Sequence, residues 1–260
     1  MPIESNNTNA NDEFNNSTTI RLDDVTVVYR VPHERVSGLK EFAIQWLQRR
    51  LRYEEFLALH NVTFQVQLGE VFGVIGRNGS GKSTMLKVMA RVLTPTNGRI
   101  RTRGRIAPLL ELGAGFHPEL TGRENVFLNM ALLGYHHRET ERLFQAIVDF
   151  SEINDFIDAP LRTYSTGMVA RLGFAVATSV RPDILLVDEV LSVGDAPFQQ
   201  KCLDRINFYR QKGTTIVIVS HSMTTIQSNC QRAVWLSHGK VMALGDVNQI
   251  VEQYSQYSGK

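Results

Sequence analysis

One segment, GRNGSGKS at 76–83, constrains the fold of this 260-residue chain more than any other. It fits the pattern G-x-x-x-x-G-K-[ST], and it lies between a strand-like run, EVFGVIG, and a helix-like run, STMLKVMARVL. Glycines let successive backbone N–H groups face inward as an anion nest, and a helix N-terminus favours phosphate. A chance glycine-rich turn would lack the flanking strand and helix, so we predict a phosphate-binding loop.

Within this loop, Lys82 is expected to reach the β- and γ-phosphates of a nucleotide, and Ser83 to place its hydroxyl on Mg²⁺. The nucleotide-binding residues that the motif predicts are Gly76, Arg77, Asn78, Gly79, Ser80, Gly81, Lys82, Ser83 and Thr84.

Two acidic residues end a second apolar run, ILLVDE at 184–189. Ligands of open α/β sheets bind at the carboxyl ends of the strands. We therefore predict that Asp188 holds Mg²⁺ in its outer shell and that Glu189 polarises the attacking water. A strand followed by a solvated acidic turn is the alternative, and the phosphate loop upstream argues against it.

A histidine follows the next apolar run, TTIVIVS. We predict that this residue, His221, contacts a γ-phosphate and has a catalytic or sensing role. A structural histidine at a strand end is the alternative.

The pattern along the chain predicts one α/β domain over residues 19–260. Residues 1–18 are rich in Asn, Ser and Thr, which predicts a disordered polar tail and no signal peptide. Apolar runs alternate with helical patterns, which is typical of helices around a parallel sheet. We expect a mostly helical subdomain at about 112–165, a long helix from Gly167 and a hairpin turning at His238–Gly239.

Residues 37–53 interrupt two β-like runs with a predicted basic amphipathic helix. Its apolar face would carry Leu39, Phe42, Ala43, Trp46, Leu47 and Leu51. Its polar face would carry Lys40, Arg49, Arg50 and Arg52. We expect this helix to lie at an anionic membrane surface, although a solvated helix packed on the core is the alternative.

Composition excludes several classes of function. A net charge of +2 lacks the basic surplus of nucleic-acid binders, so we expect no nucleic-acid partner. Two cysteines cannot form a disulfide framework, which fits a reducing compartment. No apolar run approaches the roughly 20 residues that span a bilayer, so any work at a membrane would be peripheral.

The order of these segments resembles the nucleotide-binding subunits of ABC transporters over nearly all of residues 20–245. The matching segments are Tyr29, the phosphate loop, YSTGM at 164–168, ILLVDE, SVGD at 192–195 and His221. The resemblance implies a P-loop NTPase (RecA-like) core with an antiparallel β subdomain and a helical subdomain. It also implies ATP hydrolysis with Mg²⁺ in a homodimer. Tyr29 would stack on adenine, although a half-buried strand tyrosine is the alternative, and 192–195 would cross to the partner subunit.

The YSTGM segment would be the signature that faces the γ-phosphate held by the other subunit. Its residues are Tyr164, Ser165, Thr166, Gly167 and Met168. Ser165 and Gly167 are expected to cap a helix, and a helix N-terminus is an anion site.

Three features resemble the polysaccharide exporters for O-antigen, capsule or teichoic acid: YSTGM, the helical insert and LLELGAGFHPELTGREN at 109–125. This likeness implies a subunit at the cytoplasmic face of the inner membrane that powers export of a lipid-linked glycan by an integral membrane permease pair. The 109–125 loop would face the permease. No Gln stands in this loop, and Glu111 is the expected Mg²⁺ ligand in its place, with a surface glutamate as the open alternative. We expect no C-terminal polymer-binding domain.

Other functions fit the sequence less well. An exporter ATPase for a drug, haem or lipid would share the fold, but the 109–125 segment and the insert argue against it. ABC proteins that act on ribosomes or DNA usually carry two cassettes or a coiled coil. A regulatory module without turnover is disfavoured because Lys82, Asp188, Glu189 and His221 are all present.

Overall fold

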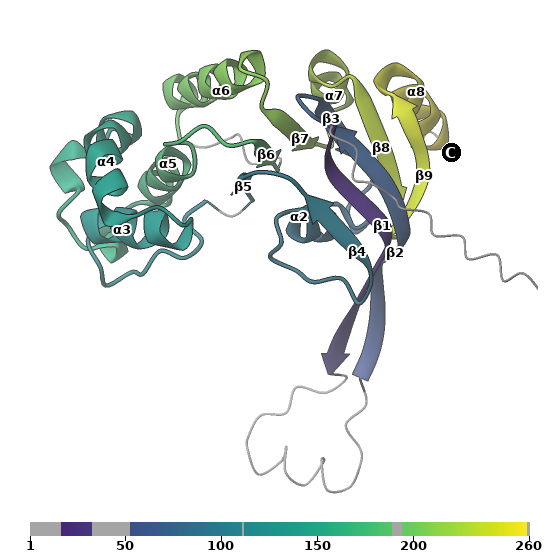
Figure 1. Ribbon diagram of the computed structural model, residues 1–260, viewed down its shortest axis with the longest axis horizontal. Helices are drawn as coiled ribbons and strands as arrows, with labels where there is room; N and C mark the ends of the chain where they lie inside the picture. Colours follow the sequence, from purple (N-terminus) through teal and green to yellow (C-terminus); the bar gives the residue numbers. More distant parts are fainter. Residues whose placement is uncertain (1–16, 33–52, 111, 189–193, 259–260) are drawn as a thin grey trace, which may run out of the picture.

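The computed structural model describes residues 17–32, 53–110, 112–188 and 194–258. In this part of the chain the strands form two sheets (Figure 1). A three-stranded antiparallel sheet has the order β2-β1-β4, with β1 at Thr18–Pro32, β2 at Tyr53–Gln67 and β4 at Asn97–Thr102. A six-stranded sheet has the order β5-β6-β7-β3-β8-β9. Its strands are β3 (Val71–Ile75), β5 (Ile106–Leu109), β6 (Ile184–Val187), β7 (Thr215–Val219), β8 (Arg232–Ser237) and β9 (Lys240–Asp246).

The six-stranded sheet is parallel except at β8–β9, which pair as the predicted antiparallel hairpin. It is covered on both faces. In β6, Leu185 and Val187 belong to one hydrophobic core, whereas Ile184 and Leu186 belong to the other. A parallel strand buried on both sides needs an unbroken apolar run, which is why ILLV does not alternate with polar residues.

Helix α2 (Lys82–Met89) begins directly after the phosphate loop and lies between the two sheets. Its Met85, Leu86, Val88 and Met89 are fully buried against side chains from both sheets. The loop at the N-terminus of α2 is therefore held by a rigid core on both sides.

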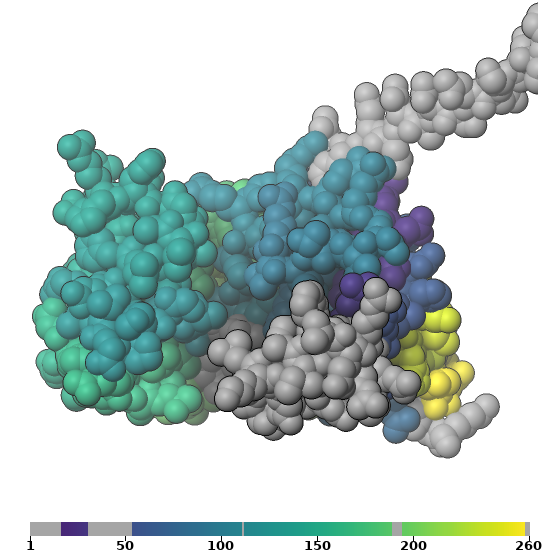
Figure 2. Space-filling model, turned by 90° about the horizontal axis from the view of Figure 1, so that it is seen from below, coloured from purple at the N-terminus to yellow at the C-terminus, as the bar shows by residue number. Residues whose placement is uncertain are grey.

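The remaining helices form two groups. Helices α3 (Gly122–Leu132), α4 (His137–Ser151) and α5 (Thr166–Ala177), with the short turns η1 (Asn154–Phe156) and η2 (Leu161–Thr163), form one end. Helices α6 (Ala196–Gln211), α7 (Met223–Asn229) and α8 (Val247–Ser258) lie along the six-stranded sheet. Seen from below, the teal α3–α4 region and the yellow C-terminal segment occupy opposite ends (Figure 2).

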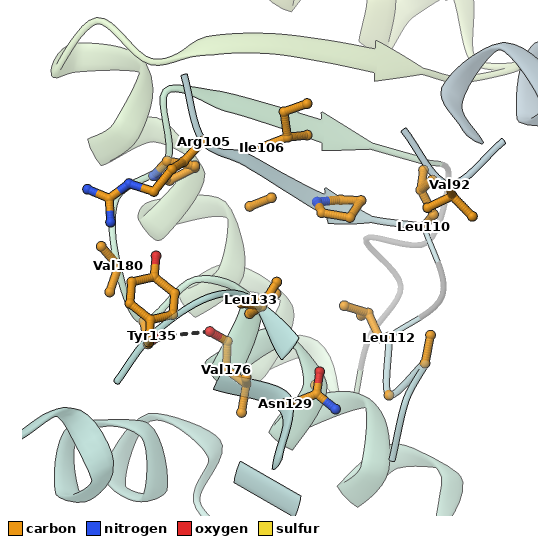
Figure 3. Close-up of a pocket in the computed structure, with 18 of the residues that line it drawn as sticks. Val92, Arg105, Ile106, Leu110, Leu112, Asn129, Leu133, Tyr135, Val176 and Val180 are labelled. Atoms are coloured by element: carbon orange, nitrogen blue, oxygen red, sulfur yellow. Dashed lines mark hydrogen bonds between the residues drawn. The ribbon is translucent and has the colours of Figure 1, made fainter. Parts of the chain in front are cut away.

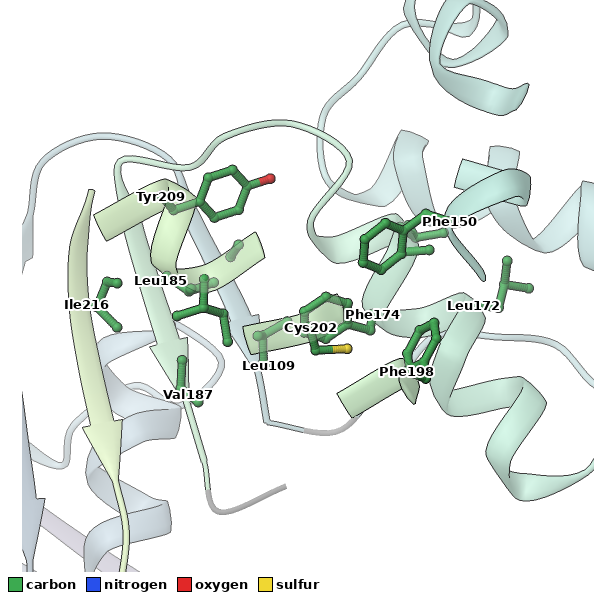
Figure 4. Close-up of a cluster of buried hydrophobic side chains, with 14 of the residues drawn as sticks. Leu109, Phe150, Leu172, Phe174, Leu185, Val187, Phe198, Cys202, Tyr209 and Ile216 are labelled. Carbon is green, nitrogen blue, oxygen red and sulfur yellow. The ribbon is translucent and has the colours of Figure 1, made fainter. Parts of the chain in front are cut away.

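Aromatic rings join the helical end to the sheet. Phe150 of α4, Phe174 of α5 and Phe198 of α6 lie with ring centroids 5.7 to 6.4 Å apart (Figure 4). Their cluster continues to Leu185 and Val187 of β6. Aromatic pairs of this kind contribute about 0.5–1.5 kcal/mol beyond their buried area, so α5 is held firmly against α4 and α6.

Several predicted boundaries were wrong. Thr18 is buried and pairs with Gln67, so the polar tail ends before residue 18. Tyr53 begins β2, so it does not belong to the insert; pairing along β1 fixes this segment as a strand. Helix α5 begins at Thr166, one residue before the predicted start. Residues 1–16 and 37–52, where the disordered tail and the amphipathic helix were predicted, lie outside the described residues. Within the described ranges, every helix is too short or too polar to cross a bilayer.

Candidate nucleotide site

The phosphate loop joins β3 to α2 with a backbone that requires glycine. Gly81, the residue before α2, has φ 105°, and a Cβ there would lie 2.6 Å from the carbonyl oxygen of Ala58. A helix leaves its first N–H groups without intrahelical acceptors, and no side chain caps α2. The N-terminus of α2 therefore has the geometry and the dipole of an anion-binding site.

A cavity of about 460 Å³ opens over this loop. It is lined by Phe56, Ala58, Asn78, Gly79, Gly81, Lys82, Ser83, Thr84 and Asp188. The loop and the carboxylate that ends β6 thus meet in one cavity.

The residues present fit Mg²⁺. Ser83 and Asp188 offer a hydroxyl and a carboxylate to the same cavity. In the part of the chain that the structure describes, there is no group of three or more His, Cys, Asp or Glu that could hold a metal. Mg²⁺ suits such a sparse site, because it usually takes one or two protein oxygens and completes its shell with waters and substrate phosphates.

Lys82 is buried, and its ammonium lies inside the loop. Its Nζ donates hydrogen bonds to the carbonyl oxygens of Gly76, at 2.8 Å, and Arg77, at 3.1 Å. The positive charge is therefore already held inside the loop by its carbonyl oxygens.

Other predicted residues surround the loop. Half-buried Tyr29 lies beside it, because its hydroxyl is 3.5 Å from Thr84 Oγ1. Arg77 and Ser80 line a separate cavity of about 270 Å³ with the β8–β9 turn. Exposed His221 follows β7, which lies between β6 and β3, so it ends at the same sheet edge as Asp188. Glu111, Glu189 and the first two residues of 192–195 lie outside the described residues.

The signature segment forms a capped helix end. Ser165 accepts a hydrogen bond from the Met168 N–H at 3.2 Å, and Ser165 and Thr166 are exposed. Tyr164 instead is buried and donates to the Phe156 carbonyl at 2.6 Å, and burial raises the pKa of its phenol. Tyr164 therefore anchors the segment within its own chain. None of the described residues 164–168 lines the nucleotide cavity of the same chain.

A charged cluster on α5 was missed by the sequence analysis. Arg171, with only 19% of its side chain exposed, pairs with Glu152 at 2.9 Å and Asp195 at 2.7 Å. Its guanidinium also lies 4.8 Å from the centre of the Phe198 ring. Asp195 caps α6 through the Phe198 N–H. Arg171 thus ties the signature helix to the end of the segment predicted to cross to a partner subunit, and only the folded structure brings these residues together.

We expect Arg171→Met to reduce ATP turnover more than ATP affinity, because the signature helix would lose its link to Asp195 while the phosphate loop stays intact. Urea unfolding should show a loss of about 1–3 kcal/mol, as for hydrogen bonds to charged groups. Arg123→Met is the matched control, since Arg123 contacts Asp158 at 2.7 Å and the Phe144 ring but is more exposed. Equal effects of the two changes on turnover would contradict the role of Arg171.

A second cavity, of about 300 Å³, lies between β5 and helices α3 and α5 (Figure 3). Its wall is mainly apolar and includes Ile106, Ala107, Leu110, Leu112, Leu133, Val176, Ala177 and Val180. Arg105 lies 5.8 Å above the Tyr135 ring at one side. The Nδ2 atom of Asn129 is buried there without a hydrogen-bond partner among the described residues. The start of the run at 109–125 that was predicted to face a permease lines this cavity, through Leu110, Leu112, Gly113 and Ala114.

One close contact fixes the floor of this cavity. A Cβ on Gly173 of α5 would lie 2.5 Å from the Gly113 nitrogen, so the helix and the loop touch through their backbones. Both glycines line the cavity. The position of the loop therefore depends directly on α5, the helix that begins at the signature.

Comparison with known families matches residues 59–192 to the model described as ABC transporter. The chain is 45% identical over 239 residues to the O-antigen export system ATP-binding protein RfbB of Klebsiella pneumoniae, which covers 91% of this chain and 97% of the relative. It is 37% identical over 241 residues to the teichoic acids export ATP-binding protein TagH of Bacillus anthracis, covering 93% of this chain and 43% of that relative.

Solved structures show the same fold. A structure of the ATP-binding subunit of an ABC transporter aligns with a TM-score of 0.70 and 23% identity, over 92% of this chain and 94% of the other. The dimeric, ADP- and Pi-bound cassette MJ0796 aligns with a TM-score of 0.67 and 22% identity, over 88% and 98%. The predicted α/β P-loop fold of the ABC ATPase type is confirmed.

Proposed function

Because this chain belongs to the ABC transporter family and is its ATP-hydrolysing subunit, we propose that it powers export of a lipid-linked polysaccharide by a separate integral membrane permease pair. The observation that carries this proposal is the 45% identity to an O-antigen export ATPase over nearly the whole of both chains. The likeness to a teichoic acid export ATPase points to the same class of cargo.

In the proposed reaction, the N–H groups at the start of α2 and the Lys82 ammonium bind the phosphates of ATP. Ser83 and Asp188 would hold Mg²⁺, with Glu111 as a further ligand, and the metal would neutralise the charge of the β- and γ-phosphates. Glu189 orients and deprotonates the attacking water, and His221 contacts the γ-phosphate. Tyr29 stacks on the adenine.

A second copy of the chain completes the site. The exposed N-terminus of α5 offers N–H groups and the hydroxyls of Ser165 and Thr166, yet it lies away from the cavity of its own chain. In a two-fold dimer it would face the γ-phosphate bound by the partner. ATP would thus join two subunits, and hydrolysis would release them.

We propose that the cavity between β5 and α5 is the docking site of the permease. Its apolar wall suits an apolar side chain, and the unpartnered Asn129 amide suits a carbonyl oxygen at the end of a helix. Because Gly113 and Gly173 touch through their backbones, a movement of α5 would displace the loop that lines this docking site. The subunit would then lie at the cytoplasmic face of the inner membrane, with residues 37–53 at the membrane surface.

Filling this cavity tests the proposal. We expect Ala177→Phe to keep the ATPase activity of the isolated subunit but to lower both copurification with the permease and surface polysaccharide at least severalfold. The phenyl ring would fill the cavity and so exclude the permease segment from it. Permease binding is measured by affinity copurification from membranes, and polysaccharide by gel staining of cell extracts.

Ser255→Phe is the matched control, because Ser255 is exposed on α8, which packs on β8 and β9 at the opposite edge of the sheet from β5. It adds the same ring and should leave both readouts unchanged. Normal copurification of the Ala177→Phe protein would contradict the docking site. Normal surface polysaccharide in cells that lack the chain altogether would contradict the proposed cargo.

A further inference from the structure

The nucleotide cavity contains an aromatic side chain that belongs to none of the sequence motifs. Phe56 of β2 lines the cavity together with the phosphate loop, although it lies 20 or more positions before the loop in the chain. Its side chain is 56% exposed. An aromatic ring on the wall of a ligand cavity, with much of its surface uncovered, is well placed to contact a planar ligand.

The pairing of β1 and β2 explains its position. Phe56 lies directly opposite Tyr29, and directly opposed residues project from the same face of a sheet. Ala58, two residues along β2, also lines the cavity, which agrees with alternation along a strand. The Tyr29 hydroxyl reaches Thr84 at the start of α2. Two aromatic residues on adjacent strands therefore flank the same side of the phosphate loop.

We propose that Phe56 forms the second aromatic contact of the nucleotide base and, with Tyr29, sets the preference for the base. This inference adds a residue to the ATP site of the proposed function. It rests on that site, but it does not depend on the cargo. Ring faces recognise the size of a stacked base and not its hydrogen-bonding edge. The pair Tyr29 and Phe56 therefore favours purines without separating adenine from guanine.

The test measures the affinity of the full chain for ADP, GDP and inorganic pyrophosphate by titration calorimetry, because none of these is turned over. Stacking on an aromatic residue is worth about 1–3 kcal/mol per base, which corresponds to roughly 5- to 150-fold in affinity. We expect Phe56→Ala to lower the affinity for ADP and for GDP about tenfold and to leave the affinity for pyrophosphate unchanged. Phe56→Trp should restore the affinity for both nucleotides.

Leu57→Ala provides the matched control. Leu57 is the next residue of β2, is 42% exposed and points to the other face, opposite Val28. It should leave all three affinities unchanged. The inference is overturned if Phe56→Ala binds ADP with wild-type affinity. It is also overturned if the affinity for pyrophosphate falls as much as the affinity for ADP, because this would mean that the substitution disturbs the phosphate loop. Failure of the wild type to bind ADP would overturn the ATP site itself and this inference with it.

Discussion

Replacing Glu189 by glutamine is expected to abolish steady-state ATP hydrolysis while leaving ATP binding intact. The amide is nearly isosteric with the carboxylate but cannot accept the proton of the attacking water, and losing a general base costs about 10²–10⁴-fold in rate. ATP would then remain bound between two subunits. Size-exclusion chromatography with light scattering should show an ATP-dependent dimer of the Glu189→Gln protein, and phosphate release should show the lost turnover.

The control is Glu252→Gln, the same change on the exposed face of α8. It should retain wild-type turnover and form no stable ATP-dependent dimer. If Glu189→Gln hydrolyses ATP at the wild-type rate, Glu189 is not the base. If the Glu189→Gln protein has no ATPase activity but stays monomeric at saturating ATP, Glu189 can still be the base, but the proposed dimer with ATP bound between two subunits is contradicted.

The sequence was most informative where chemistry requires particular residues close together in the chain. The phosphate loop could be predicted because its glycines, Lys82 and Ser83 lie within residues 76–83 and act through one turn and one helix end. The strand before Asp188 could be predicted because burial on both faces leaves a continuous apolar run. These local signals were enough for the α/β fold and for the loop that joins β3 to α2.

The features that were missed depend on tertiary contacts. Phe56 is one aromatic residue among many until β1 and β2 pair and place it opposite Tyr29. Arg171 is separated by 19 residues from Glu152 and by 24 from Asp195, so their cluster has no local pattern. Tyr53 was assigned to the end of the helical insert, because its place in a strand follows mainly from pairing with β1. Tyr164 belongs to the signature by sequence, but its burial makes it an anchor.

The signature helix offers a test of whether each ATP site is shared by two subunits. Gly167→Asp is suited to this test, because a Cβ there would come no closer than 3.8 Å to the Ser165 hydroxyl. A carboxylate in the first turn of α5 is also compatible with the helix dipole. The variant should fold normally, yet it places a negative charge where a partner's γ-phosphate must bind. We expect it to lose nearly all ATPase activity, and we expect the same of Lys82→Ala, which removes the ammonium from the opposite side of the site.

Mixing the two inactive proteins should restore activity. A mixed dimer has one site with both defects and one site with a normal loop and a normal signature, so random pairing predicts about a quarter of the wild-type rate. ATPase assays on equimolar mixtures measure this directly. Gly245→Asp, on β9 where a Cβ would meet no atom within 4 Å, is the control and should be active alone. Because a site built within one chain would leave every subunit of the mixture defective, a mixture as inactive as its components would contradict the shared site.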